Sequence, residues 1–196
     1  MINNFKEYNI PILFNQGIKD KNMHNRDIMA TIMKNAMERF KKSDLDYGLI
    51  CDDDFFPAAN FLEELNKTVA LLPANWRALH LCPGYLWGRR MRDATKIGHL
   101  NPEYIMDGIP YHESGRFYLN SDNRLYASKN FWLGGPIAVL LNKANVDDFL
   151  NHFVFQYTHT KLNNDVILTL ILTSNDYICR EPMLGYEKEE GGTTFS

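Results

Sequence analysis

Three consecutive carboxylates, Asp52, Asp53 and Asp54, are the residues of this chain with the clearest chemical potential. They follow an apolar run, Tyr47 to Cys51, which predicts a buried strand. Like charges this close repel, and hard divalent cations such as Mn²⁺ or Mg²⁺ prefer carboxylate oxygens as ligands. Because residues two apart on a strand point to the same side, Asp52 and Asp54 are expected to share one ion while Asp53 faces elsewhere. An acidic turn with solvated carboxylates is the other interpretation.

The elements around this triplet alternate between strand and helix. Strands are predicted at Pro11 to Asn15, at Gly48 to Cys51 and at Arg77 to Cys82. An apolar stripe from Ile28 to Phe40 predicts the first helix. A second helix follows Asn60, which forms a capping-box pattern with Glu63, and Pro73 stops it. This order predicts an α/β protein with parallel strands covered by helices, and it places the acidic triplet at the carboxyl end of a central strand.

The second half of the chain begins less regularly. Residues 83–127 are rich in glycine, proline and aromatic residues, which predicts long loops of the kind that often form lids or binding sites. One hairpin is expected between 117–119 and 125–127. A strand at 136–141, a helix at 146–153 and a strand at 177–179 follow. Residues 166–172 favour a helix, although the run would also suit a strand.

Length and charge exclude several classes of protein. The 196 residues fit a single domain, 1–196, and the net charge of −3 argues against a nucleic-acid partner. No apolar run approaches the roughly 20 residues of a membrane span, so no integral membrane segment is expected. The three cysteines stand among apolar neighbours, which is typical of buried thiols in a reducing compartment and predicts a cytoplasmic location.

Four segments of the chain resemble segments of a known family. Residues 47–54 look like the strand and Asp-x-Asp motif of GT-A-type glycosyltransferases. In the same order, 71–81, 135–144 and 164–165 resemble segments of the lipopolysaccharide-type glycosyltransferases, and small glycosyltransferases of large algal viruses share a similar layout. The resemblance spans residues 10–182. It departs from the family at Arg77, where an aspartate is usual, and in having no histidine after His159, so the late histidine ligand is missing or replaced.

The resemblance implies a GT-A fold, with a mainly parallel central sheet and helices on both faces. It implies a metal-dependent enzyme that moves a sugar from a UDP- or GDP-sugar to a hydroxyl group of a glycan or other acceptor. Asp52 and Asp54 would hold Mn²⁺ or Mg²⁺, and Asp52 and Asp53 would also bind the donor.

Four further residues follow from the same resemblance. Asp165 is the candidate general base, or else the N-cap of a helix, a position that favours aspartate. Arg26 is a candidate ligand of the nucleotide, or else a surface arginine. Gly134 and Gly135 are expected to let the backbone approach the donor closely, or else to form a plain turn.

Two other functions compete with glycosyl transfer. The first is a divalent-metal phosphohydrolase or nuclease, which would usually need further acidic or histidine ligands for a second metal. The second is a non-catalytic sugar- or nucleotide-binding module in which the triplet is structural or binds Ca²⁺.

Overall fold

The structure is a computed structural model that describes residues 5, 18, 20–52, 55–81, 117–119, 138–179 and 184–187. Its helices are α2 (Asn25–Lys42), α3 (Phe61–Val69), α7 (Val146–Thr160) and α8 (Asn164–Leu170), with a 3-10 turn η3 (Lys143–Asn145). Its strands are β1 (Tyr47–Cys51), β2 (Phe55–Pro57), β3 (Ala78–His80), β4 (Phe117–Leu119), β5 (Ala138–Asn142), β6 (Asp176–Cys179) and β7 (Gly185–Glu187). The predicted strand at Pro11 to Asn15 lies outside the described residues.

The central sheet is mixed, so the prediction of a mainly parallel sheet was wrong. The strand order is β1-β5-β3-β6-β4. Among the described strands, only β3 and β6 pair in parallel, whereas β5 runs antiparallel to both of its neighbours and β4 runs antiparallel to β6. The prediction was based on the alternation of strands and helices in the first half of the chain. Strands β1 and β3 from that half do run in one direction, but β5 from the second half lies antiparallel between them.

Strand β1 comes last in the order of the described strands. Among them it lies at one end of the sheet and pairs only with β5, and the prediction that β1 is a central strand stays a prediction, because residues 11–15 lie outside the described residues. Burial agrees with this order. All five residues of β5 are buried, whereas Tyr47 of β1 is exposed and the rest of β1 is half-buried.

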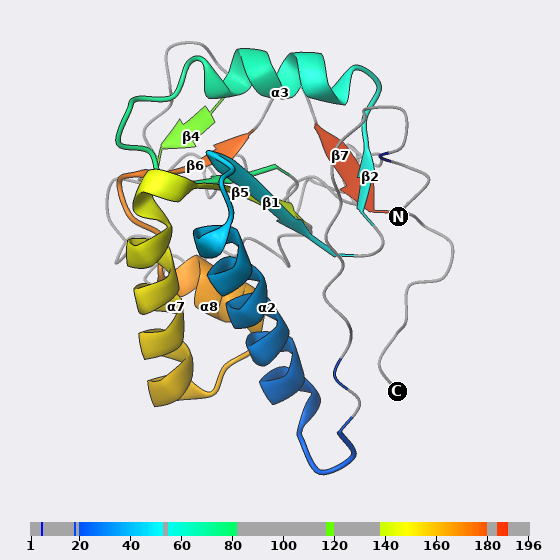
Figure 1. The fold of residues 1–196 in the computed structure, drawn as a ribbon, viewed down its shortest axis with the longest axis vertical. Helices are drawn as coiled ribbons and strands as arrows, with labels where there is room; N and C mark the ends of the chain where they lie inside the picture. Colours follow the sequence, from blue (N-terminus) through cyan, green and yellow to red (C-terminus); the bar gives the residue numbers. More distant parts are fainter. Residues whose placement is uncertain are drawn as a thin grey trace, which may run out of the picture.

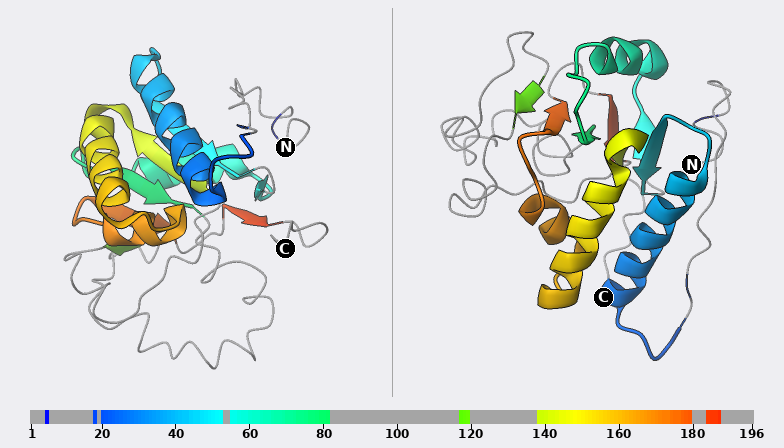
Figure 2. Two further views of the ribbon diagram at one scale, coloured as in Figure 1. Left: turned by 90° about the horizontal axis from the view of Figure 1, so that it is seen from below. Right: turned by 60° about the vertical axis from the view of Figure 1, so that its left-hand side comes forward.

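Helices lie on both sides of the sheet. Figure 1 shows α2, α7 and α8 together on one side of the strands and α3 on the other side, and Figure 2 shows the same arrangement from two further directions. The paired helices α2 and α7 run side by side against the sheet. The mixed α/β class that the sequence predicted is therefore confirmed.

Apolar spacing explains the helices that cover the core. In α7 the buried residues Val146, Phe149, Leu150 and Phe153 recur at helical spacing, and α2 buries Ala30, Met37 and Phe40. The helix favoured at 166–172 is confirmed as α8. Among the described residues, no helix is both long and apolar enough to cross a membrane.

The capping box predicted for α3 was wrong. Asn60 does precede the helix, but its backbone is left-handed, with φ 61° and ψ 26°, and its side chain makes no capping hydrogen bond. A capping side chain needs an extended backbone at this position to reach the first free N–H groups. Of the predicted hairpin, β4 pairs with β6, and the proposed partner at 125–127 lies outside the described residues.

Candidate metal site and its surroundings

The carboxyl ends of three strands meet at one edge of the sheet. Because β5 is antiparallel to both β1 and β3, and β6 is parallel to β3, the strands β1, β3 and β6 all run in one direction. At their carboxyl ends, Cys51 pairs with Ala138, and the Leu81 N–H donates to the Ala138 carbonyl at 3.0 Å. We call this the triplet edge, because Asp52 follows Cys51 there. Ligands of open α/β sheets commonly bind beyond such strand ends.

The described part of the acidic triplet belongs to a turn. Strand β1 ends at Cys51, and the Phe55 N–H donates to the Asp52 carbonyl at 3.2 Å, which is the hydrogen bond of a β-turn. Asp52 is exposed, and Asp53 and Asp54 lie outside the described residues. The sharing of one ion by Asp52 and Asp54 stays a prediction.

An aromatic cluster underlies this turn. Phe55 is fully buried, its ring stacks on Phe5 with 6.0 Å between ring centroids, and it meets the ring of Phe61 edge-on at 6.1 Å. Strand β2, which begins at Phe55, pairs with β7 so that Phe55 lies opposite Glu187. The turn is thus fixed at one end by the sheet and at the other by buried aromatic packing.

A buried histidine lies one strand position before the triplet edge. His80 is fully buried on β3, and neither ring nitrogen has a hydrogen-bond partner in the part of the chain that the structure describes. Burial, followed by the positive charge of Arg77, lowers the pKa of His80 from 6.5 to about 3. The imidazole is therefore neutral at physiological pH.

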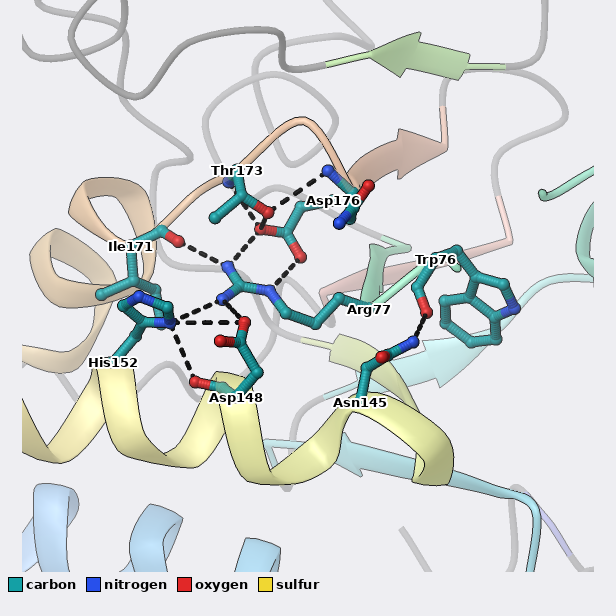
Figure 3. A network of polar contacts seen from close by, with 9 residues as sticks. Trp76, Arg77, Asn145, Asp148, His152, Ile171, Thr173 and Asp176 are labelled. Carbon is teal, nitrogen blue, oxygen red and sulfur yellow. Dashed lines mark hydrogen bonds and ion pairs between the residues drawn. The ribbon is translucent and has the colours of Figure 1, made fainter. Parts of the chain in front are cut away.

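A second polar cluster lies at the opposite edge of the sheet, where β3 and β6 begin (Figure 3). The Arg77 Nε donates to Oδ1 of Asp176 at 2.9 Å, and its Nη2 donates to Oδ2 of Asp176 and, at 2.5 Å, to the Ile171 carbonyl. Its Nη1 donates to Oδ2 of Asp148 at 2.7 Å and lies 3.0 Å from Nδ1 of His152. The guanidinium also lies over the Phe149 ring, 5.1 Å from its centroid.

Four of the N–H groups of Arg77 donate to oxygen atoms, and the Nη1 atom also lies against Nδ1 of His152. Burial alone would lower the pKa of Arg77, but the hydrogen bonds and charges of Asp176 and then Asp148 outweigh burial and raise it. The side chain is therefore engaged in contacts within the protein. It joins β3 to α7, to the end of α8 and to β6, which is a structural role.

Asp165 does not cap α8. The N-cap residue is Asn163, and Asp165 stands in the first helical turn, where its Oδ1 accepts from the Val166 N–H at 2.9 Å. Its side chain is half-buried. The neighbouring Asn164 has a buried Oδ1 with no hydrogen-bond partner among the described residues, which leaves an acceptor at the start of this helix.

The other predicted site residues are not brought together by the described structure. Arg26 is exposed in the first turn of α2, close enough to Tyr157 of α7 for its charge to act on that hydroxyl. Tyr157 donates to Asp27, and burial followed by that hydrogen bond raises the pKa of Tyr157 to about 12. Gly134 and Gly135 precede β5 by a few residues and lie outside the described residues.

The described residues hold no group of three acidic, histidine or cysteine side chains that could bind a metal. Two members of the acidic triplet are not among those residues, so the metal prediction stays untested. The donor chemistry fits nonetheless, because an exposed carboxylate on a fixed turn offers the oxygen ligand that Mn²⁺ and Mg²⁺ prefer. No family model, no curated protein and no solved structure matches this chain.

Proposed function

We propose that the protein is a metal-dependent glycosyltransferase of the GT-A type, acting on a UDP- or GDP-sugar. One observation carries this proposal: the acidic triplet begins at a turn fixed to the sheet edge where β1, β3 and β6 end. Exposed Asp52 and fully buried Phe55 are only three residues apart, so the carboxylate of Asp52 lies close to a packed core. Rigid support of this kind is what a binding site for a charged ligand requires.

In this proposal one group of residues binds the metal ion and the donor, and a second group acts on the acceptor. Asp52 and Asp54 would hold Mn²⁺ or Mg²⁺, and the chemistry that the ion supplies when bound is neutralisation of the negative charge on the departing nucleoside diphosphate. Asp53 and Arg26 would bind the nucleotide, and Gly134 and Gly135 would admit the donor sugar close to the backbone.

Asp165 would act on the acceptor. A carboxylate within hydrogen-bond reach of a sugar hydroxyl can take its proton as the hydroxyl attacks the anomeric carbon. The buried Oδ1 of Asn164 beside it has no hydrogen-bond partner among the described residues, and it would accept from a further hydroxyl of the glycan. Both residues come from the start of α8, so one helix would orient the acceptor and activate it.

The first test is metal-dependent donor binding. Calorimetry of the wild-type protein with a panel of UDP- and GDP-sugars should show binding with Mn²⁺ and at least tenfold weaker binding without it. Asp52→Asn and Asp54→Asn should each weaken Mn²⁺ binding at least tenfold, because an amide keeps the shape but removes the charge that holds the cation. Asp44→Asn, an exposed aspartate before β1, is the control that should change nothing.

The outcomes of this panel separate the competing functions. Binding of Ca²⁺ and free sugar with no nucleotide requirement would favour the non-catalytic module. Hydrolysis of phosphate esters without sugar transfer would favour the phosphohydrolase or nuclease. Equal donor affinity with and without metal would remove the basis of the proposal.

Asp165→Asn provides the test of the base. We expect turnover to fall by 10²-fold or more, in line with the usual contribution of general-base catalysis, while donor affinity stays within about twofold. Stability should be nearly unchanged, because asparagine is tolerated in the first helical turn and Asn163 remains the N-cap. Transfer rate, donor affinity and melting temperature would be measured on the one variant. An active Asp165→Asn protein would assign the base to another residue.

A further inference from the structure

We propose that His152 makes a pH-sensitive contact between α7 and β3: its neutral ring accepts a hydrogen bond from Arg77, and its protonated ring leaves Arg77 and donates to Asp148. This inference goes beyond the proposed function, because it involves neither the acidic triplet nor a sugar or a metal. It rests on the arrangement in Figure 3, where His152 and Asp148 of α7 lie against the guanidinium of Arg77.

Charged groups from three elements lie around the His152 ring. Its Nδ1 lies 3.0 Å from Nη1 of Arg77, 2.9 Å from the carbonyl oxygen of Asp148 and 3.4 Å from Oδ2 of Asp148. On the other side of the guanidinium, Arg77 is held by Asp176 of β6 and by the Ile171 carbonyl at the end of α8. The His152 side chain is 50% exposed, so protons from water can reach it.

Chemistry fixes the direction of the contact between Arg77 and His152. A guanidinium offers only N–H donors and keeps its charge in proteins, so its Nη1–H can bond to Nδ1 only where Nδ1 presents a lone pair. A neutral imidazole carries one ring proton, which must then be on Nε2. The Asp148 carbonyl needs no bond from the ring, because within α7 it is placed to accept from the backbone N–H four residues later. The neutral ring of His152 is therefore an acceptor toward Arg77.

A second proton on the ring reverses this contact. Nδ1–H would then face Nη1–H, which places two donors and two positive charges 3.0 Å apart. The same N–H has an acceptor close by, because Oδ2 of Asp148 is 3.4 Å away. The protonated ring therefore turns from Arg77 to Asp148 and competes for the carboxylate that Arg77 also binds. Arg77 keeps Asp176 and the Ile171 carbonyl, so protonation loosens its hold on α7 but not on β6 or α8.

His159 provides a matched control on the same helix. It is also exposed, and its Nδ1 lies 2.7 Å from the carbonyl oxygen of Phe155, which repeats the contact of His152 with the carbonyl four residues earlier. In the part of the chain that the structure describes, no ion pair includes His159. Its Nδ1 therefore donates to that carbonyl, and the neutral ring of His159 carries its proton on the opposite nitrogen from His152.

The first measurement is the position of the ring proton. Long-range nitrogen–proton NMR spectra of the histidine rings at pH 8 distinguish the two neutral forms of imidazole. We expect the proton of His152 on Nε2 and that of His159 on Nδ1. A proton on Nδ1 of His152 at pH 8 would overturn the inference, because Arg77 would then have no acceptor on the ring.

The second measurement is proton exchange between the Arg77 guanidinium and water, compared at equal pH between the wild type and His152→Asn. The Oδ1 of asparagine takes the place of Nδ1 as an acceptor but cannot take up a proton. The two proteins should exchange at similar rates at pH 8. At pH 5.5 the wild type should exchange roughly fivefold faster or more, because an imidazole changes its charge between these pH values. His80 does not contribute, since its pKa is about 3.

Two lysine variants separate the contact from a general effect of charge. His152→Lys places a permanent positive donor beside Arg77, so it should show at pH 8 the fast exchange that the wild type shows only at pH 5.5. His159→Lys adds the same charge about 10 Å further along the helix and should stay within about 1.5-fold of the wild type. Should His152→Lys not fold, the comparison with His152→Asn decides.

Two outcomes of the exchange measurements would contradict the inference. One is an equal effect of the two lysine variants. The other is a ratio of wild-type to His152→Asn exchange that is the same at pH 8 and pH 5.5. None of these measurements involves metal or sugar binding, so the proposed function and the role of His152 are tested separately.

Discussion

Replacing Arg77 with methionine should destabilise the protein by about 3–5 kcal/mol, the usual cost of removing one partner from a buried ion pair. Methionine fills much of the volume but leaves the fully buried carboxylate of Asp176 without its bidentate partner. A domain of this size has a total stability of roughly 5–15 kcal/mol, so the loss is a large fraction of it. Urea unfolding followed by circular dichroism would measure the change.

The remaining variants show whether the pair itself is responsible. Arg77→Lys keeps the charge but supplies three donors in place of five and no planar fork, so it should recover only part of the stability. Arg77→Met combined with Asp176→Asn should cost clearly less stability than the sum of the two single changes. Each single change leaves one buried charge without its partner, whereas the double variant removes both charges.

Lys67→Met is a control for ion pairs in general. Lys67 lies 2.7 Å from both Glu63 and Glu64, but it is on the exposed surface of α3. Its replacement should leave the urea midpoint nearly unchanged, since exposed pairs contribute little. An Arg77→Met protein as stable as the Lys67→Met control would show that the buried cluster does not hold the layers together.

Sequence patterns could predict the helices and most strands because those elements depend on local periodicity. The apolar spacing in α2 and α7 specifies a buried face whatever the topology is, and the strand before the acidic triplet is marked by its apolar run. Strand direction is different. It depends on the path of the long segment between β3 and β5, and no local pattern in residues 83–137 determines that path.

The residues that pack around the candidate site could not be predicted either, because their contacts join segments far apart in the sequence. The sequence singled out the carboxylates, but Gly185 and Phe55 are ordinary residues far apart in the chain. Only the pairing of β2 with β7 shows that a side chain at position 185 would collide with the buried ring of Phe55. Arg77 gave a signal, a charged residue at the start of an apolar strand. Its partners Asp148 and Asp176 are 71 and 99 positions away and could not be assigned without the fold.

The capping box is a case in which the local pattern was present but the expected structure did not form. The pattern of Asn60 and Glu63 is correct in spacing, but the backbone at Asn60 is left-handed because the chain enters α3 directly from the turn after β2. The path of the chain between β2 and α3 therefore determined the backbone angles at Asn60, against the local preference for a capping box.

The buried imidazole of His80 should make the protein acid-sensitive. The unfolded chain binds a proton at this residue with a pKa near 6.5, whereas the folded protein does so only near pH 3. The unfolded state therefore carries more protons between these values, and stability falls as the pH falls through this range. The free energy of unfolding therefore falls by roughly 4–5 kcal/mol between neutral pH and pH 3, and roughly 2 kcal/mol of this is lost already at pH 5.

Two substitutions at this position isolate the effect. His80→Leu and His80→Gln both remove the titrating group, so each should flatten the plot of unfolding free energy against pH between 6.5 and 5, where few carboxylates titrate in the unfolded chain. They should differ at pH 7. Leucine removes two buried nitrogens that have no partner among the described residues and should stabilise the fold, whereas glutamine keeps unpaired polar atoms and should not. Urea unfolding at several pH values measures both effects. A wild-type slope that survives in His80→Leu would mean that His80 is already charged or solvated in the folded protein.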